Sequence, residues 1–392
     1  MIVGFLVSRV ALSISMFLFG INAIRDVSPR QWLKQKWWLL GMIWVAIYAV
    51  TYFWSDDKAN WHTRLEVKLP FLLLPLAFSF LPPFTKKQLQ IFTVTTALLF
   101  VAASMYSVSF LIRDPAYYIS QYKQSHVLPT LPKYDHIRAS LAIVLFIIWS
   151  VYVWPSLQGK ATKWVVGTSL FLLVIYVHIL AAKSGMVSLY IFVVLWGIYL
   201  AFGKKKLLGF LIIISIPISF VIAIKCIPTF YERANYVGFS VIMFRNGDTT
   251  GKYGDIARIM SYRLATKLIA QHPLTGVGTG DMHTEMNHAY DIYYPATPVE
   301  GRLIPHDQFL IVALGCGIPA MIIFIIWVFM PLAQIRRNRA GFFFFVVWFL
   351  LFLQLLIEPV LEVQFGVFLY LFFLLMQKHE LPEIKRDVLP QA

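Results

Sequence analysis

The chain has 392 residues, of which 59% are hydrophobic, 16% aromatic and 14% charged, with a mean hydropathy of +0.70. A soluble protein of this length needs a larger polar surface, so the composition excludes the soluble classes and indicates an integral membrane protein. The net charge of +15 would suggest nucleic acid as the partner of a soluble protein. In a membrane protein, basic residues mainly set orientation and contact lipids, so we expect membrane lipids and no nucleic acid as partners.

Apolar stretches of membrane-spanning length recur along the whole chain. The first stretch carries Arg9 and lacks a basic start, so we expect a retained span and not a cleaved signal peptide. Residues 164–202 are too long for one crossing and are expected to fold back at Lys183-Ser184-Gly185. We therefore predict an all-α integral membrane protein with about eleven transmembrane helices, near 1–24, 37–54, 68–84, 89–112, 138–156, 164–182, 185–202, 207–226, 307–332, 341–357 and 363–377.

The basic residues of the short connections fall on one side of such an eleven-span chain, and the positive-inside rule assigns that side to the cytoplasm. The remaining connections, among them the long segment 227–306, then face outward. We predict three parts: spans one to eight in 1–226, an extracytoplasmic catalytic loop in 227–306, and spans nine to eleven with a short cytoplasmic tail in 307–392.

The long segment contains one helical pattern, DIARIMSYRLATKLIAQHP at 255–273. Asp255 suits the cap and a proline follows the end, so we place this helix near 256–271. At 100° per residue, Arg258 and Tyr262 share the apolar face, whereas Arg263 and Lys267 share the opposite one. Arg258 therefore points toward the protein, where it either serves a substrate, pairs with a buried acid or snorkels to the interface.

The stretch PLTGVGTGD follows this helix at 273–281. Its glycines resemble a phosphate-binding loop only superficially, because no strand precedes them and no Lys-Ser/Thr pair follows. Glycines at alternate positions indicate a tight turn that passes close to another part of the chain.

Three segments together are similar to the O-antigen ligase and polymerase superfamily: Lys183-Ser184-Gly185, the run from Arg258 through His272-Pro273 to Asp281, and Pro305-His306-Asp307 followed by Leu310 and Gly317-Ile318. The resemblance implies transfer of a glycan from undecaprenyl diphosphate to an acceptor hydroxyl. It further implies an inverting mechanism without metal or cofactor, in the bacterial inner membrane with the active site on the periplasmic side.

Within this resemblance, His306 takes the place of the family's histidine base, and Arg258 and Lys183 those of the arginines on the diphosphate. Displacing a diphosphate builds negative charge that fixed cations stabilise, and a neutral imidazole suits removal of the hydroxyl proton. We expect the dipole of the following helix to favour that neutral form. Lys183 departs from the family arginine and loses the bidentate fork. Asp307 departs from the amide or small polar residue that typically follows the family's histidine, and we interpret it as a helix cap rather than a residue that orients the ring.

Five further residues are predicted to contact substrate: Arg302, Arg64, Tyr262, Gly278 and Gly280. Structural interpretations, without a role in substrate binding or catalysis, stay open for several residues. His306 suits an interfacial histidine, Arg302 a solvated loop charge, and Arg64 an anchor at the start of a span. His178, inside an apolar span, is typical of a core histidine with satisfied hydrogen bonds.

The predicted function is O-antigen ligation to the lipid A core, with a glycan polymerase of the same superfamily as the alternative. The polymerase would use a second carrier-linked glycan as acceptor. A transporter or flippase is the rival from another class. Two observations disfavour the transporter: the sequence has no two halves with matching broken helices, and its polar residues gather at one membrane face.

Overall fold

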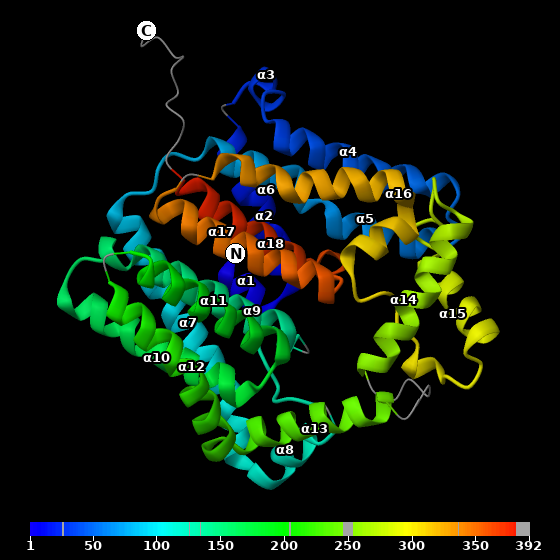
Figure 1. Cartoon of the computed structure of the whole chain (residues 1–392). Coiled ribbons are helices and arrows are strands. Elements are labelled where there is room, and N and C mark those ends of the chain that lie inside the picture. Colours follow the sequence, from blue (N-terminus) through cyan, green and yellow to red (C-terminus); the bar gives the residue numbers. More distant parts are fainter. Residues whose placement is uncertain are drawn as a thin grey trace.

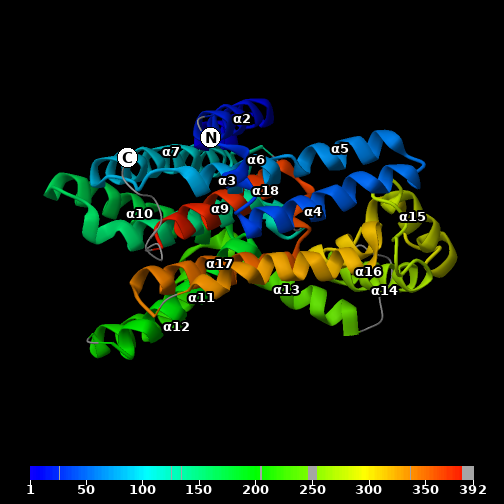
Figure 2. The ribbon, with the colours of Figure 1, turned by 90° about the horizontal axis from the view of Figure 1, so that it is seen from above.

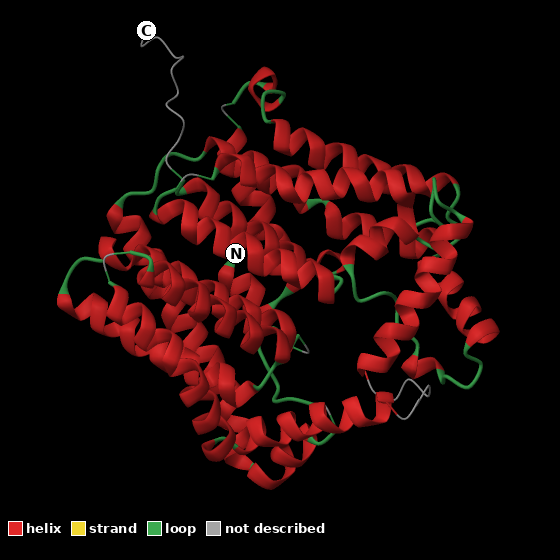
Figure 3. Cartoon of the chain, in the orientation of Figure 1, coloured by secondary structure: helices red, strands yellow, loops and turns green. Residues whose placement is uncertain are grey.

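The computed structural model describes residues 1–381 except 26, 125, 134, 204, 246–253 and 336. Helices and loops make up all of this described part, and it contains no strand (Figure 3). The prediction of an all-α protein is confirmed. The elements in chain order are α1 Ile2–Val7, α2 Arg9–Ile24, α3 Pro29–Trp32, α4 Lys36–Val50, η1 Thr51–Phe53, α5 Lys58–Lys68, α6 Pro70–Phe80, α7 Lys86–Arg113, α8 Pro115–Tyr122, α9 His136–Val153, η2 Trp154–Ser156, α10 Lys160–Leu180, α11 Lys183–Ala201, α12 Lys206–Cys226, α13 Pro228–Arg245, α14 Gly254–Gln271, α15 Met282–Tyr293, η3 Val299–Gly301, α16 Gln308–Phe329, η4 Met330–Gln334, α17 Arg339–Ile357, η5 Val360–Glu362 and α18 Gln364–His379.

Eight helical segments of the described chain are long and apolar enough to cross a membrane. The other three predicted spans are shorter here. The first is split at Ser8 into α1 and α2, α6 has 11 residues and α18 has 16. The number of crossings therefore stays a prediction. The eight candidates are Lys36–Phe53, Lys86–Arg113, His136–Ser156, Lys160–Leu180, Lys183–Ala201, Lys206–Cys226, Gln308–Gln334 and Arg339–Ile357.

Helix α18 forms the centre of the bundle. Every residue from Phe365 to Gln377 is buried, because α6, α9 and α17 pack around it. A helix that is apolar on all sides must either lie in a core or face lipid, and α18 takes the first solution. Helix α12 takes the second: of its 21 residues only Gly209 and Ala223 are buried, so nearly its whole surface faces outward beside α11 (Figure 1).

The chain folds back between α10 and α11, as the length of 164–202 predicts. The turn itself was predicted two residues too late. Ala181 adopts the left-handed conformation (φ 50°) that ends many helices, and Lys183 already opens α11. Gly185 lies in the first turn of α11 because it packs on α9, where a Cβ at this position would lie 2.5 Å from Cβ of Ser140.

Helix α16 is interrupted at Gly317, whose φ is 85°, two residues before Pro319. The loop 273–278 bonds to the interrupted backbone. Val277 N–H donates to the Leu314 carbonyl (2.8 Å), Gly278 N–H donates to the Gly315 carbonyl (3.2 Å), and Ile318 N–H donates to the Pro273 carbonyl (2.8 Å). These bonds replace ones that the broken helix cannot make, so the glycine-rich stretch is a close-packed turn.

Helices α13, α14 and α15 fill the segment between α12 and α16, where short helices were predicted but only one of them was located in the sequence. Helix α14 begins at Gly254, two residues earlier than expected, and the side chain of its predicted cap Asp255 lies outside the described residues. Helices α14 and α15 lie beyond one end of α16 (Figures 1 and 2) and share a second hydrophobic core with it. That core contains Met260, Leu264, Ala265, Leu268, Met282, Met286, Ala289, Tyr290, Ile311 and Leu314.

The start of α18 gives a test of this packing. A Cβ at Gly366 would overlap the Val360 carbonyl oxygen, whereas a Cβ at Gly238 of α13 would meet no atom within 4 Å. Gly366→Ala should lower the free energy of unfolding by about 1–3 kcal/mol. Gly238→Ala, the matched control, should leave it unchanged or raise it by up to about 1 kcal/mol. Thermal unfolding in detergent, followed by tryptophan fluorescence, measures both. Equal free energies of unfolding for the two variants would contradict the close packing of Gly366 on Val360.

Candidate active site

His306 lies immediately before the cap of α16. The Asp307 carboxylate accepts a hydrogen bond from Leu310 N–H (2.9 Å), so Asp307 caps the helix as interpreted from the sequence. Burial raises the pKa of this carboxyl. The Tyr262 hydroxyl on α14 donates to the His306 carbonyl (2.8 Å). Thus α14 and α16 together fix the position of the histidine backbone.

Glu358, directly after α17, joins His306 to Arg258. Its Oε1 lies 2.5 Å from a terminal nitrogen of Arg258, and its Oε2 lies 3.3 Å from Nδ1 of His306. The His306 contact is within ion-pair distance but lacks hydrogen-bond geometry. Such contacts often tighten only when substrate is bound. The carboxylate is 6% exposed, whereas His306 and Arg258 are 23% and 30% exposed, so the two basic groups face outward from a buried acid.

The surroundings keep Glu358 ionised. Burial alone would raise the pKa of its carboxyl, but the contacts with His306 and the charge of Arg258 outweigh burial and hold the pKa below its usual value. The stabilisation from these contacts is therefore present above the ordinary carboxyl pKa and is lost as the pH falls through the lowered one. At neutral pH the site contains a fixed negative charge behind His306.

Glu362, four residues further on, holds a second polar cluster. Its Oε2 binds Nη1 of Arg64 (2.9 Å), and its Oε1 binds Nζ of Lys68 (2.8 Å) and Nε2 of Gln308 (2.8 Å). Tyr48 donates to the same Oε1. Gln308 is the first residue of α16, two positions after His306. The two acids of this turn therefore contact His306 itself and Gln308, which lies two residues after it.

The sequence prediction missed both acids, and it missed Arg138. Arg138 is mostly buried near the start of α9, pairs with Asp135 (3.4 Å), and its charge helps to lower the pKa of Glu358. Lys183 begins α11, and Gly185 in the same turn packs on Ser140 of α9, two residues after Arg138. The starts of α9 and α11, which carry Arg138 and Lys183, therefore pack against each other, and the role of Lys183 at the site stays a prediction.

The other residues that were predicted to contact substrate make contacts within the protein that stabilise the fold. Arg302 pairs with Asp291 (2.7 Å) and donates to two carbonyls, which fastens η3 to α15. Arg64 is bound to Glu362. Gly278 and Gly280 pack so closely on Ser55 and Asp57 that no Cβ would fit. Substrate binding by these four residues stays a prediction, and His306, Arg258 and Tyr262 are the predicted residues that the structure brings together.

His178 has the surroundings of a core histidine. Its Nδ1 is 2.8 Å from the Val174 carbonyl, its Nε2 is 2.9 Å from the Tyr190 hydroxyl, and its ring stacks on Phe230.

A sequence model of the O-antigen ligase family matches residues 168–325 of the chain. This range includes Lys183, Arg258 and His306 and ends within α16, so Glu358 and Glu362 lie beyond it. The fold is that of a multi-pass membrane protein, and the match confirms the resemblance to the O-antigen ligase superfamily noted in the sequence. Among curated proteins, none matches the chain.

The buried cluster around Glu362 predicts a large effect on stability. Glu362→Gln leaves two basic side chains buried without their counter-charge, and should lower the free energy of unfolding by about 3–5 kcal/mol at neutral pH. Glu66→Gln removes an exposed acid whose ion pair within the described residues is with exposed His62, and it serves as the control with an expected change within about 0.5 kcal/mol.

The stabilisation by Glu362 should also depend on pH. Burial raises the pKa of Glu362, but Lys68 and Arg64 lower it to about 2, against an ordinary value of 4.5. The wild-type protein should therefore lose this stabilisation as the pH falls from 4.5 toward about 2, and Glu362→Gln should lack that loss. Parallel stability curves for wild type and Glu362→Gln would contradict a structural role for this acid.

Proposed function

We propose that this protein transfers a glycan from undecaprenyl diphosphate to an acceptor hydroxyl. The specific reaction that we propose is the ligation of O-antigen to the lipid A core. The observation that carries the proposal is the contact of Glu358 with both Arg258 and His306, two residues within the segment that matches the O-antigen ligase family. The arrangement combines a base, a buried acid behind it, and a cation beside it. We further propose that the site faces the periplasm from the bacterial inner membrane.

In the proposed reaction, His306 accepts the proton of the attacking hydroxyl. Its Nδ1 faces Glu358, which leaves Nε2 as the atom directed to the substrate. The hydroxyl oxygen bonds to the anomeric carbon while the bond from that carbon to the diphosphate breaks on the opposite side, so the configuration inverts. Glu358 stabilises the positive charge that the imidazole gains, as the carboxylate does in other base-and-acid pairs.

Arg258 is proposed to stabilise the leaving diphosphate. A guanidinium carries five N–H donors, and the contact with Glu358 involves one terminal nitrogen. The remaining donors can meet phosphate oxygens, where negative charge builds up as the bond breaks. Lys183 and Arg138 would add to this positive field. The transfer is proposed to be metal-independent because these side chains supply the charge that a metal ion would otherwise supply.

Removal of the base gives the first test. In a host that lacks the gene, His306→Ala should fail to restore surface glycan, since loss of a general base costs about 10²–10⁴-fold in rate. His178→Ala serves as the control for loss of a histidine, and both proteins should reach the membrane in wild-type amounts. Normal surface glycan with His306→Ala would contradict the role of His306.

The same deletion strain distinguishes the alternatives when lipopolysaccharide and lipid-linked glycans are both resolved by size. Full-length chains that accumulate on the carrier, together with a bare lipid A core, identify a ligase. Single repeat units on the core identify a polymerase. No change in either pool would contradict a transferase and would favour a transporter or flippase.

Glu358 gives a test of the charge behind the base. Glu358→Gln keeps the shape of the side chain but removes its charge, and should lower kcat by about 10²–10⁴-fold with a smaller effect on KM. Glu300→Gln in η3 alters an exposed acid between α15 and α16 and should leave kcat within about twofold. Partial recovery with Glu358→Asp would support the proposal. Equal kcat in the wild-type protein and Glu358→Gln would exclude a role for this charge.

A further inference from the structure

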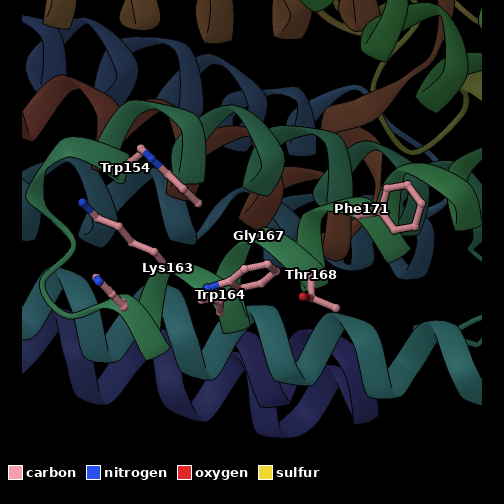
Figure 4. Close-up of a pocket in the computed structure, with 7 residues that line it drawn as sticks. Trp154, Lys163, Trp164, Gly167, Thr168 and Phe171 are labelled. Atoms are coloured by element: carbon pink, nitrogen blue, oxygen red, sulfur yellow. The ribbon is translucent and has the colours of Figure 1, made fainter.

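A cavity of about 610 Å³ lies between η2 and the first half of α10 (Figure 4). Its walls are Trp154, Lys160, Lys163, Trp164, Gly167, Thr168 and Phe171. None of the residues of the candidate active site is among them. This cavity therefore needs an explanation other than the proposed transfer reaction.

The cavity lies at the end of the bundle opposite the candidate active site. Arg339, the first residue of α17, donates to the carbonyls of Val151 and Tyr152 (2.7 and 3.1 Å), just before η2. Helix α17 then has 19 residues and ends beside Glu358. At a rise of 1.5 Å per residue the two ends are about 28 Å apart, close to the thickness of a bilayer core.

The cavity walls combine two cations with aromatic surface. Neither Lys160 nor Lys163 pairs with an acid within the part of the chain that the structure describes. Trp164 and Phe171 are 75% and 65% exposed, and they continue the same face of α10 away from the lysines. In Figure 4, Lys163 lies toward one end of the cavity, Phe171 lies at the other, and the ring of Trp164 lies between them.

The spacing along α10 suits a lipid in one leaflet. Lys163 and Phe171 are eight residues apart, which is about 12 Å along a helix and just under half of a hydrocarbon core about 30 Å thick. Lysine and tryptophan are the residues that anchor proteins at the headgroup level, while phenylalanine suits the acyl region. A phosphate beside the lysines would thus leave an acyl chain of ordinary length beside Trp164 and Phe171.

Two further contacts keep the cavity open. Gln90 of α7 donates to the Thr162 hydroxyl (2.9 Å) and accepts from Gln158 N–H (3.1 Å), which fixes the chain on both sides of Lys160. The absence of a side chain at Gly167 provides space, since a Cβ there would already lie 3.4 Å from the Trp154 ring. A larger side chain at Gly167 would fill the cavity.

We propose that this cavity binds an anionic phospholipid, with its phosphate beside Lys160 and Lys163 and an acyl chain along Trp164, Gly167 and Phe171. The charge of the lysines selects an anionic over a zwitterionic headgroup. The apolar walls select a lipid over a free phosphate or a nucleotide, for which the cavity offers no further cation. The inference does not depend on the proposed transfer reaction.

Native mass spectrometry of the full-length protein, titrated with phosphatidylglycerol or phosphatidylethanolamine, tests the proposal. Each lysine near a membrane surface strengthens binding of anionic lipid by about fivefold, so K160Q/K163Q should weaken phosphatidylglycerol binding by roughly 25-fold. K205Q/K206Q removes the same charge at the start of α12, outside the cavity, and is the matched control. We expect it to retain phosphatidylglycerol binding.

A cavity-filling variant distinguishes a site from a general charge effect. Gly167→Leu keeps both lysines and should still reduce phosphatidylglycerol binding, whereas Gly167→Ala should not. Phosphatidylglycerol and phosphatidylethanolamine binding equally well to the wild-type protein would overturn the proposal. So would equal losses in the two lysine-pair variants, or undiminished binding in K160Q/K163Q. These lysines are partly or fully exposed, so their variants should fold even where Gly167→Leu does not.

Discussion

Two buried carboxylates on the turn between α17 and α18 hold together parts of the chain that are far apart in sequence. A buried charge is costly unless paired, so Glu358 and Glu362 each require basic partners nearby. Glu362 draws Arg64 and Lys68 of α5 against the start of α16, and Glu358 draws Arg258 of α14 against His306. The position of the proposed base therefore depends on ion pairs that also stabilise the fold.

The architecture follows largely from hydropathy, because helix length is set by the thickness of the membrane. The fold-back within 164–202 was predicted from length alone. Its turn is at Ala181 and not at Gly185, because Gly185 lies inside α11, where it packs on Ser140 of α9. Helices α13 and α15 were missed because polar residues interrupt them. The spacing of Met282, Met286, Ala289 and Tyr290, all buried, was a signal that would have identified α15.

The candidate site was predictable only in part. The helical wheel placed Arg258 and Tyr262 on the inward face of α14, and both contact the region of His306. The partner of Arg258 was not predictable, since Glu358 is 100 residues away and only tertiary structure brings the two together. A signal existed nonetheless: two acids within five residues, between two apolar stretches, are unusual enough to deserve a search for basic partners.

The break in α16 also constrains the order in which the protein assembles. Its backbone groups at Leu314, Gly315 and Ile318 bond to the loop 273–278 instead of to their own helix. In lipid such groups would be left without partners, so α16 cannot take its final place until that loop has folded against it. The loop is synthesised before α16 and is therefore already available. If the chain up to α15 and the chain from α16 onward are synthesised separately, α16 should consequently reach its final place only when the first fragment is present.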